Sequence, residues 1–175
     1  MQKIIFTFLF LLLLPLNYIF AQKSGYENLP WGSSIDEIRK KYPNIERTTD
    51  TDPDFNNSVN YLEKYASGSI ESREFILWKN KLVKVLVKYN IDNITADGLM
   101  NNFKNKFGEP FDDAYDEKEV SGNTVKKYDF YWNNNGTRVI LRVVSMGYFE
   151  TVLTLYISLK QLDEYNSEKS KDIEF

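Results

Sequence analysis

The sequence predicts an α+β fold in which two short helices pack on an antiparallel sheet of about five or six strands. Three observations carry this prediction: two capped segments with helical spacing, several runs rich in β-branched residues, and an Asn-Gly turn between two of those runs. The residues after an N-terminal leader suffice for one domain and are too few for two ordinary ones. We therefore expect a single α+β domain over residues 22–165.

The first 21 residues are typical of a secretory signal peptide. Lys3 precedes an apolar run that Pro15 ends, and the small residue Ala21 precedes Gln22. An uncleaved membrane anchor is the alternative, although Pro15 leaves a clean run shorter than the ~20 apolar residues that a span needs. We expect cleavage after Ala21, which predicts a periplasmic or secreted protein with no membrane span after cleavage.

A first helix is predicted from Ser34 to Tyr42. Ser34 and Glu37 have the spacing of a capping box, in which a hydroxyl and a carboxylate bond each other's backbone amides. Ile35, Ile38 and Tyr42 then recur at helical spacing, and Pro43 ends the helix. Residues 44–58 are polar and acidic, which indicates a loop.

Strands are predicted at 60–65, 73–78 and 82–89. In the last of these, Lys84 and Lys88 interleave with aliphatic residues, which is typical of a half-buried antiparallel strand. A second helix follows, with Leu99, Phe103 and Phe107 on one face, Asn93 or Thr95 as its cap and Gly108 as its stop.

The C-terminal part predicts an acidic loop at 111–123, a hairpin and a last strand at 151–159. The hairpin joins strands 127–132 and 138–145 through a turn that contains Asn135-Gly136, a strong hairpin signal. Residues 166–175 are predicted to be a frayed charged tail. Both halves run helix, loop, strand and strand, which suggests a duplicated α-β-β unit; ordinary alternation in an α+β chain explains the likeness equally well.

This layout resembles the small bacterial envelope domains of the BamE/SmpA-like and β-lactamase-inhibitor-protein-like group. The likeness rests on Trp31-Gly32-Ser33-Ser34-x-x-Glu37 and on Lys106-Phe107-Gly108-Glu109-Pro110, each followed by strands. The resemblance implies an envelope interaction module, and none of that group's ligand-binding residues can be placed here.

Composition excludes many chemistries, because the chain has neither cysteine nor histidine. Disulfides, thiol nucleophiles, imidazole ligands, catalytic triads and lipoprotein anchors all require one of these side chains. Without the leader and its lysine, 21 basic residues face 25 acidic ones, a net charge of −4 that argues against a nucleic-acid partner.

Two clusters of acidic residues have compositions that occur in functional sites. Asp50, Asp52, Asp54 and Asn56 alternate like the first ligands of a calcium loop, but the glycine and glutamate that such a loop needs are replaced by Phe55 and Tyr61. A second group could in principle supply the acid and base of a glycosidase: Asp112, Asp113, Asp116, Glu117 and Glu119. We interpret both groups as solvated loops and predict no metal, no cofactor and no catalytic residue.

Aromatic residues on the strands give the candidate binding surface. Phe130 and Trp132 should share one face and Tyr131 the other, so one set is core and the opposite face is available for binding. The candidate residues are Tyr131, Tyr128, Trp78 and Trp132.

The sequence thus predicts a non-enzymatic extracytoplasmic binding module with an envelope protein or glycan as partner. The alternative is a carboxylate-dependent hydrolase of envelope glycans, which would need two acidic side chains in one cleft.

Overall fold

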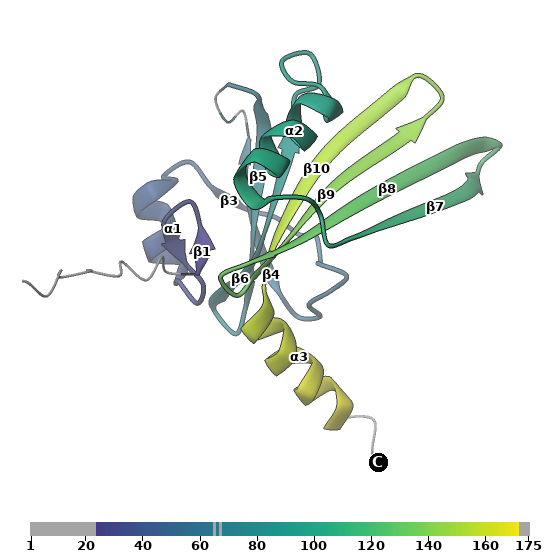
Figure 1. Ribbon diagram of the computed structural model, residues 1–175. Helices are drawn as coiled ribbons and strands as arrows, with labels where there is room; N and C mark the ends of the chain where they lie inside the picture. The colour runs from purple at the N-terminus through teal and green to yellow at the C-terminus, as the bar shows by residue number, and fades with distance from the viewer. Residues whose placement is uncertain (1–23, 65, 67, 172–175) are drawn as a thin grey trace, which may run out of the picture.

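The computed structural model describes residues 24–64, 66 and 68–171 (Figure 1). The predicted signal peptide lies outside the described residues, as do residues 172–175. In chain order the elements are β1 (Gly25–Tyr26), β2 (Leu29–Pro30), α1 (Ile35–Lys41), β3 (Glu46–Arg47), β4 (Val59–Lys64), β5 (Ile70–Trp78), β6 (Lys81–Tyr89), α2 (Ala96–Phe107), β7 (Asp112–Val120), β8 (Asn123–Asn134), β9 (Thr137–Met146), β10 (Phe149–Ser158) and α3 (Leu159–Lys171).

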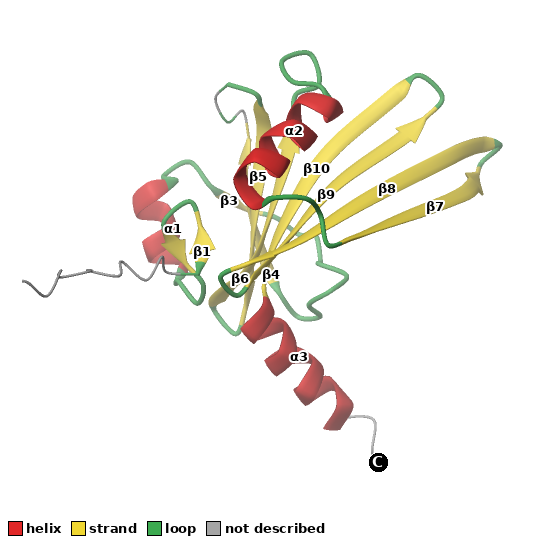
Figure 2. Ribbon diagram, viewed as in Figure 1, coloured by secondary structure: helices red, strands yellow, loops and turns green. Residues whose placement is uncertain are grey.

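An eight-stranded antiparallel sheet dominates the molecule, in the order β3-β4-β5-β6-β10-β9-β8-β7 (Figure 2). Strands make up 49% of the structure and helices 22%, so the predicted fold class of two short helices on a smaller sheet is wrong. The predicted α-β-β unit is wrong as well, since α1 and α2 are each followed by four strands. In each half these strands run from one edge of the sheet to its centre, where β6 pairs with β10.

The first face of the sheet carries α1 and α2 and holds the larger core. Ile38 and Tyr42 from α1 and Leu99 and Phe103 from α2 pack on the strands. The helix signals in the sequence are confirmed locally: Ser34 and Glu37 form the capping box, and Thr95 caps α2.

The second face holds a smaller core beneath α3 and the loop before β4. Tyr165 of α3 packs against Phe55 of the loop and Trp78 of β5, with ring centroids 5.1 and 5.5 Å apart. Helix α3 extends to Lys171, so the prediction of a frayed tail from residue 166 is wrong over 166–171. Tyr165 belongs to this helix and anchors it to the sheet.

The predicted acidic loop at 111–123 is instead the edge strand β7 with a tight turn to β8. Acidic side chains are tolerated on this strand because all nine of its residues are exposed, so none has to be buried. Lysines on β8 also lie opposite its carboxylates: Asp116 pairs with Lys127, and Glu117 with Lys126. Cross-strand pairing of this kind outweighs the low strand propensity of Asp and Glu.

Candidate functional site

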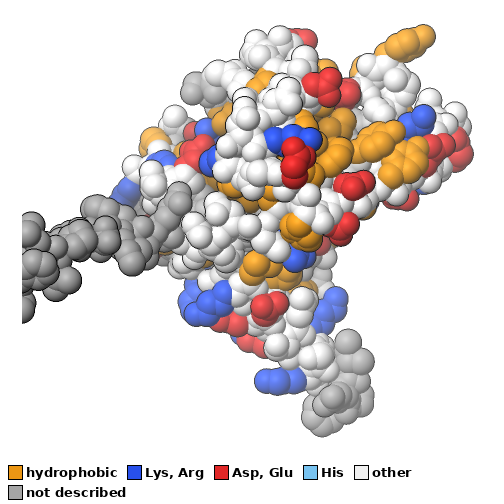
Figure 3. Space-filling view, in the orientation of Figure 1, with side chains coloured by type: hydrophobic (Ala, Val, Ile, Leu, Met, Phe, Trp, Pro, Cys, Tyr) orange, Lys and Arg blue, Asp and Glu red, His pale blue; other side chains and the backbone are white. Residues whose placement is uncertain are grey.

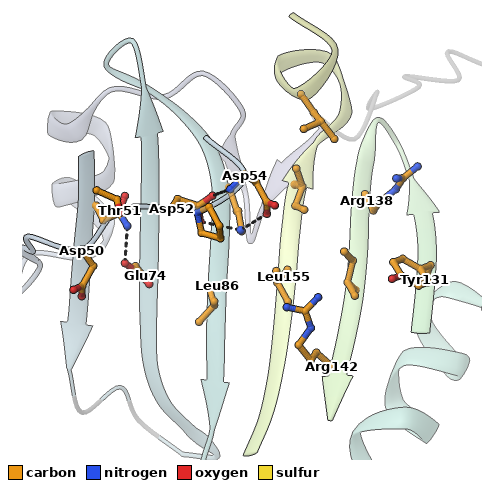
Figure 4. A pocket seen from close by; sticks show the side chains of 16 residues that line it. Asp50, Thr51, Asp52, Asp54, Glu74, Leu86, Tyr131, Arg138, Arg142 and Leu155 are labelled. Carbon is orange, nitrogen blue, oxygen red and sulfur yellow. Dashed lines mark hydrogen bonds and ion pairs between the residues drawn. The ribbon is translucent and has the colours of Figure 1, made fainter. Parts of the chain in front are cut away.

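A groove of about 500 Å³ lies on the second face of the sheet, beside the smaller core (Figure 4). Its floor is apolar and comes from Leu86 of β6, Ile140 of β9, and Leu155 and Ile157 of β10. One wall is the loop of residues 50–54, and Leu162 of α3 lines the groove near its end. Because α1 and α2 cover the opposite face, the groove is separate from the larger core.

The loop wall is held to the sheet by a buried ion-pair network around Lys84. The Lys84 ammonium lies 2.8 Å from Asp52 and 2.6 Å from Asp54. The side chains of Lys84 and Asp52 are 3% and 6% exposed, whereas that of Asp54 is 47% exposed. Charges this deeply buried are stable only when they are paired and hydrogen-bonded, so the network fixes the loop position.

Asp52 also shapes the loop from within. Its second carboxylate oxygen accepts hydrogen bonds from the backbone amides of Asp54, at 2.9 Å, and Phe55, at 3.2 Å. Asp52 is therefore not in a solvated loop, contrary to the interpretation from sequence. Of the alternating aspartates, Asp52 and Asp54 form ion pairs with the Lys84 ammonium. The described residues contain no cluster of three acidic, histidine or cysteine side chains suited to a metal ion.

Glu74 of β5 adds a carboxyl to this side of the groove, and its pKa is raised above the ordinary value for glutamate. Asn60 Nδ2 donates a hydrogen bond to Glu74 Oε1 at 2.9 Å. Burial raises the pKa of the Glu74 carboxyl, the nearby Asp50 and Asp52 carboxylates raise it further, and Asn60 and Lys84 act to lower it. Glu74 therefore holds its proton more readily than a solvated glutamate.

The opposite side of the groove carries two arginines from β9. Arg142 donates two hydrogen bonds to Asp129, at 2.7 and 2.8 Å, and this contact raises the pKa of the guanidinium. Arg138 differs, because its Nε donates a hydrogen bond to a neutral group, the amide oxygen of Asn133, at 3.4 Å. Within the described part of the chain, Arg138 makes no ion pair with a carboxylate, so its charge is available to a ligand.

Together these groups make a groove with charge of opposite sign on its two sides. In Figure 4, Asp50 and Glu74 lie toward β4 and β5, and Arg138 and Arg142 lie toward β9. Apolar side chains separate the two sides. Such an arrangement fits a ligand with a cationic group at one end, an anionic group at the other and an apolar middle.

The four aromatic residues singled out from the sequence do not form one surface. Trp132 is 2% exposed in the larger core, where its indole nitrogen donates to the Gly108 carbonyl at 2.9 Å. Trp78 is buried in the smaller core, and Tyr128 lies exposed on the first face. Only Tyr131 lines the groove, on the face opposite Phe130 and Trp132, as strand alternation predicts.

The acidic group that the hydrolase alternative invoked lies elsewhere. Asp112, Asp113, Asp116, Glu117 and Glu119 are all exposed on β7, and none of them lines the groove. Of the charged residues that do line it, Asp50, Asp52 and Asp54 were considered from the sequence only as a calcium loop, and the other four were missed as site residues: Glu74, Lys84, Arg138 and Arg142. The sequence carried no signal for the burial of Lys84, because a lysine between Val83 and Val85 also fits a solvent-facing position on a half-buried strand.

Comparisons with protein-family profiles, with curated proteins and with solved structures found no match. Across the described residues, no helix has the length and apolar character required to cross a bilayer.

Proposed function

We propose that this protein is a non-enzymatic binding module that acts outside the cytoplasm, in the periplasm or as a secreted protein. Its ligand is a peptide segment of an envelope protein that carries a cationic group, an apolar middle and a carboxylate. The observation that supports this proposal is the separation of charge across an apolar floor in the groove. A neutral glycan fits less well, because it would leave Arg138 without an anionic partner.

Each end of the ligand has a physical counterpart in the groove. A carboxylate at Arg138 would form a charge-assisted hydrogen bond, worth about 1.5–3 kcal/mol in a partly buried site. A cationic group would lie near Asp50 and Glu74, since Asp52 is already occupied by Lys84. Aliphatic side chains between them would cover Leu86 and Leu155.

The test is calorimetric titration with the free tripeptide Ala-Leu-Leu, whose only cation is its α-ammonium, and two blocked forms of it. The free peptide should bind, and the N-acetylated and C-amidated forms should each bind roughly tenfold more weakly, since tenfold corresponds to about 1.4 kcal/mol. Arg138→Gln should remove the difference between the free carboxylate and the amide. Arg47→Gln is the matched control, because Arg47 is exposed on β3 and does not line the groove.

Two results would reject the proposal. The first is that none of the three peptides binds to the wild-type protein. The second is that Arg138→Gln binds the free peptide and the amide with the same preference as the wild type, which would place the ligand carboxylate elsewhere.

Export has its own test, since it depends on the leader and not on the groove. The full chain with a C-terminal tag, expressed in a bacterial host, should be released by osmotic shock and begin at Gln22 by N-terminal sequencing. Protein that keeps Met1 in the cytoplasmic fraction would contradict export, and retention of Met1 in the membrane fraction would indicate the uncleaved anchor.

A carboxylate-dependent hydrolase of envelope glycans is the second candidate, and Glu74 is the observation that favours it. A half-buried carboxyl with a raised pKa beside a second carboxylate is the arrangement a glycosidase uses for its general acid. If this candidate is right, purified protein releases reducing sugar ends from cell-wall glycan, and Glu74→Gln abolishes the release. Absence of release by the wild type removes the candidate and leaves the binding proposal standing.

A further inference from the structure

The two edges of the sheet are built differently. At one edge β3 has two residues, whereas at the other β7 has nine, all of them exposed. Short edge strands limit unwanted pairing with other chains, and a long exposed edge offers a template for an added strand. In Figure 1 the hairpin of β7 and β8 projects away from α1 and α3. The outer edge of β7 is therefore the accessible one.

The turn before β8 determines which backbone groups of β7 face outward. Ser121 and Gly122 have φ values of 53° and 79°, which is the conformation of a two-residue type I′ turn. The residues that flank such a turn, Val120 and Asn123, form a hydrogen-bonded pair, and pairs alternate from there. The residues whose backbone N–H and C=O groups point away from β8 are consequently Asp113, Tyr115, Glu117 and Glu119.

A local contact supports this assignment. The backbone amide of Asp113 donates to the Asp112 side chain at 3.0 Å, as an amide that is not bonded to β8 can do. The outward amides of Tyr115, Glu117 and Glu119 remain for a partner strand.

The charge of β7 selects among the strands that could pair with it. The strand carries five carboxylates and one lysine, a formal net charge of −4. Pairing β7 with its equivalent in a second copy would bring two such strands together, and like charges on adjacent strands are destabilising. A basic strand would instead place its cations beside the carboxylates of Asp113, Glu117 and Glu119.

An aromatic pair adds a place for one apolar side chain. The ring centroids of Tyr115 and Tyr128 lie 4.8 Å apart, and the two residues are 51% and 39% exposed. They lie on the same face as Asp113 and Glu117, because side chains alternate along a strand. Figure 3 shows hydrophobic side chains flanked by acidic ones over the projecting hairpins.

We propose that the outer edge of β7 binds an extended basic segment of another protein, which joins the sheet as an added strand. Backbone hydrogen bonds to the outward amides supply affinity, and alternate side chains supply specificity. On the side facing Tyr115, the segment has an apolar residue flanked at alternate positions by lysine or arginine. This site is separate from the groove, whose lining includes no residue of β7.

The first experiment uses a blocked octapeptide in which threonine alternates with, in order, Lys, Lys, Leu and Lys, added to the full chain. Its matched control replaces each lysine with glutamate. The basic peptide should bind at least tenfold more tightly than the acidic one, and its affinity should fall with added salt. The proposal is overturned if the two peptides bind equally, or if the basic peptide does not bind at millimolar concentration. In that case the carboxylates of β7 serve to prevent pairing of this edge with other strands.

Hydrogen exchange followed by NMR then tests the geometry. Bound peptide should slow exchange at the outward amides of Tyr115, Glu117 and Glu119, and should change little at Asp116, which already bonds β8. Binding without slower exchange at these outward amides would show that the peptide contacts side chains only, contrary to the proposal.

Two substitutions of Glu117 test separately the backbone hydrogen bond to the peptide and the charge of the side chain. Glu117→Pro removes an outward N–H and no bond to β8, so it should keep the fold and weaken the peptide at least tenfold. Glu117→Lys should weaken the peptide severalfold, whereas Asp163→Lys, the same charge change on exposed α3, should not. Wild-type affinity in both Glu117 variants would overturn the proposal, as would a stable dimer of the wild type that either variant dissolves.

Discussion

The Lys84 ammonium lies among aliphatic side chains, where a charge is stable only with its partners. Lys84→Met should lower the free energy of unfolding by about 3–5 kcal/mol, because it leaves the buried Asp52 carboxylate without a cation. Urea unfolding followed by circular dichroism measures this change. Lys79→Met is the matched control: Lys79 pairs with Glu168 at the surface, where a pair contributes about 0–1 kcal/mol.

A second substitution identifies the cause of that loss. In the double variant Lys84→Met with Asp52→Asn, neither member of the buried pair is charged, and the Asn amide oxygen can still accept from the backbone amides of Asp54 and Phe55. Part of the lost stability should return. A double variant less stable than Lys84→Met alone would show that the loss arises from packing and not from the unpaired carboxylate.

Glu74 predicts a dependence of stability on pH. Burial raises its pKa in the folded protein above the ordinary value of 4.5, so the folded state binds the proton more tightly than the unfolded state. The contribution of Glu74 to stability therefore falls as pH rises through the interval above that value. Glu74→Gln should gain stability relative to the wild type as pH rises above about 4.5, measured by urea unfolding. A difference that stays constant with pH would contradict the shift.

At the scale of the elements, the stability of the short helix α1 depends on its N-terminal cap. It has seven residues, too few to be stable alone, and Ser34 with Glu37 forms a reciprocal cap at its start. Ser34→Ala should cost about 1 kcal/mol in urea unfolding. Ser167→Ala, in the exposed part of α3, is the control and should change stability by less than about 0.5 kcal/mol. Equal effects of the two substitutions would show that the cap contributes nothing specific.

Elements with a local cause could be predicted from the sequence. The capping box and the Asn135-Gly136 turn act within a few residues, and the structure contains both, with φ values of 47° and 72° in the turn. The acidic strand β7 could not be predicted, because its partner lysines come from β8 and not from its own segment. Helix α3 depends on distant contacts in the same way, since Tyr165 packs on Phe55 and Trp78.

The groove was harder to predict than the fold, because its charged residues come from the loop and three strands that are far apart in sequence. Lys84 pairs with Asp52 across 32 positions, and its pattern in β6 indicates a solvent-facing lysine. A bulge in β6 makes Val83 an extra residue opposite β5, so it disturbs the simple alternation there. The sequence thus shows which charged residues the chain contains, but it does not show that those of the groove lie close together in the folded protein.

At the scale of the whole molecule, both cores depend on the same strands. Phe75 and Ile76 are adjacent on β5, and the first faces the larger core while the second faces the smaller one. Leu141 and Ile140 of β9 divide in the same way. A strand that leaves the sheet therefore disrupts both cores at once, which predicts one cooperative unfolding transition.

Tryptophans in the two cores can test this cooperativity separately. Trp132 lies in the larger core and Trp78 in the smaller, so variants that keep one of them and replace the other tryptophans with phenylalanine report on each core alone. In each variant, the urea midpoint from fluorescence should coincide with its own midpoint from far-ultraviolet circular dichroism. If the Trp78 signal changes at lower urea than the circular dichroism, α3 and the loop before β4 open on their own, and the groove they line would then be lost before the sheet unfolds.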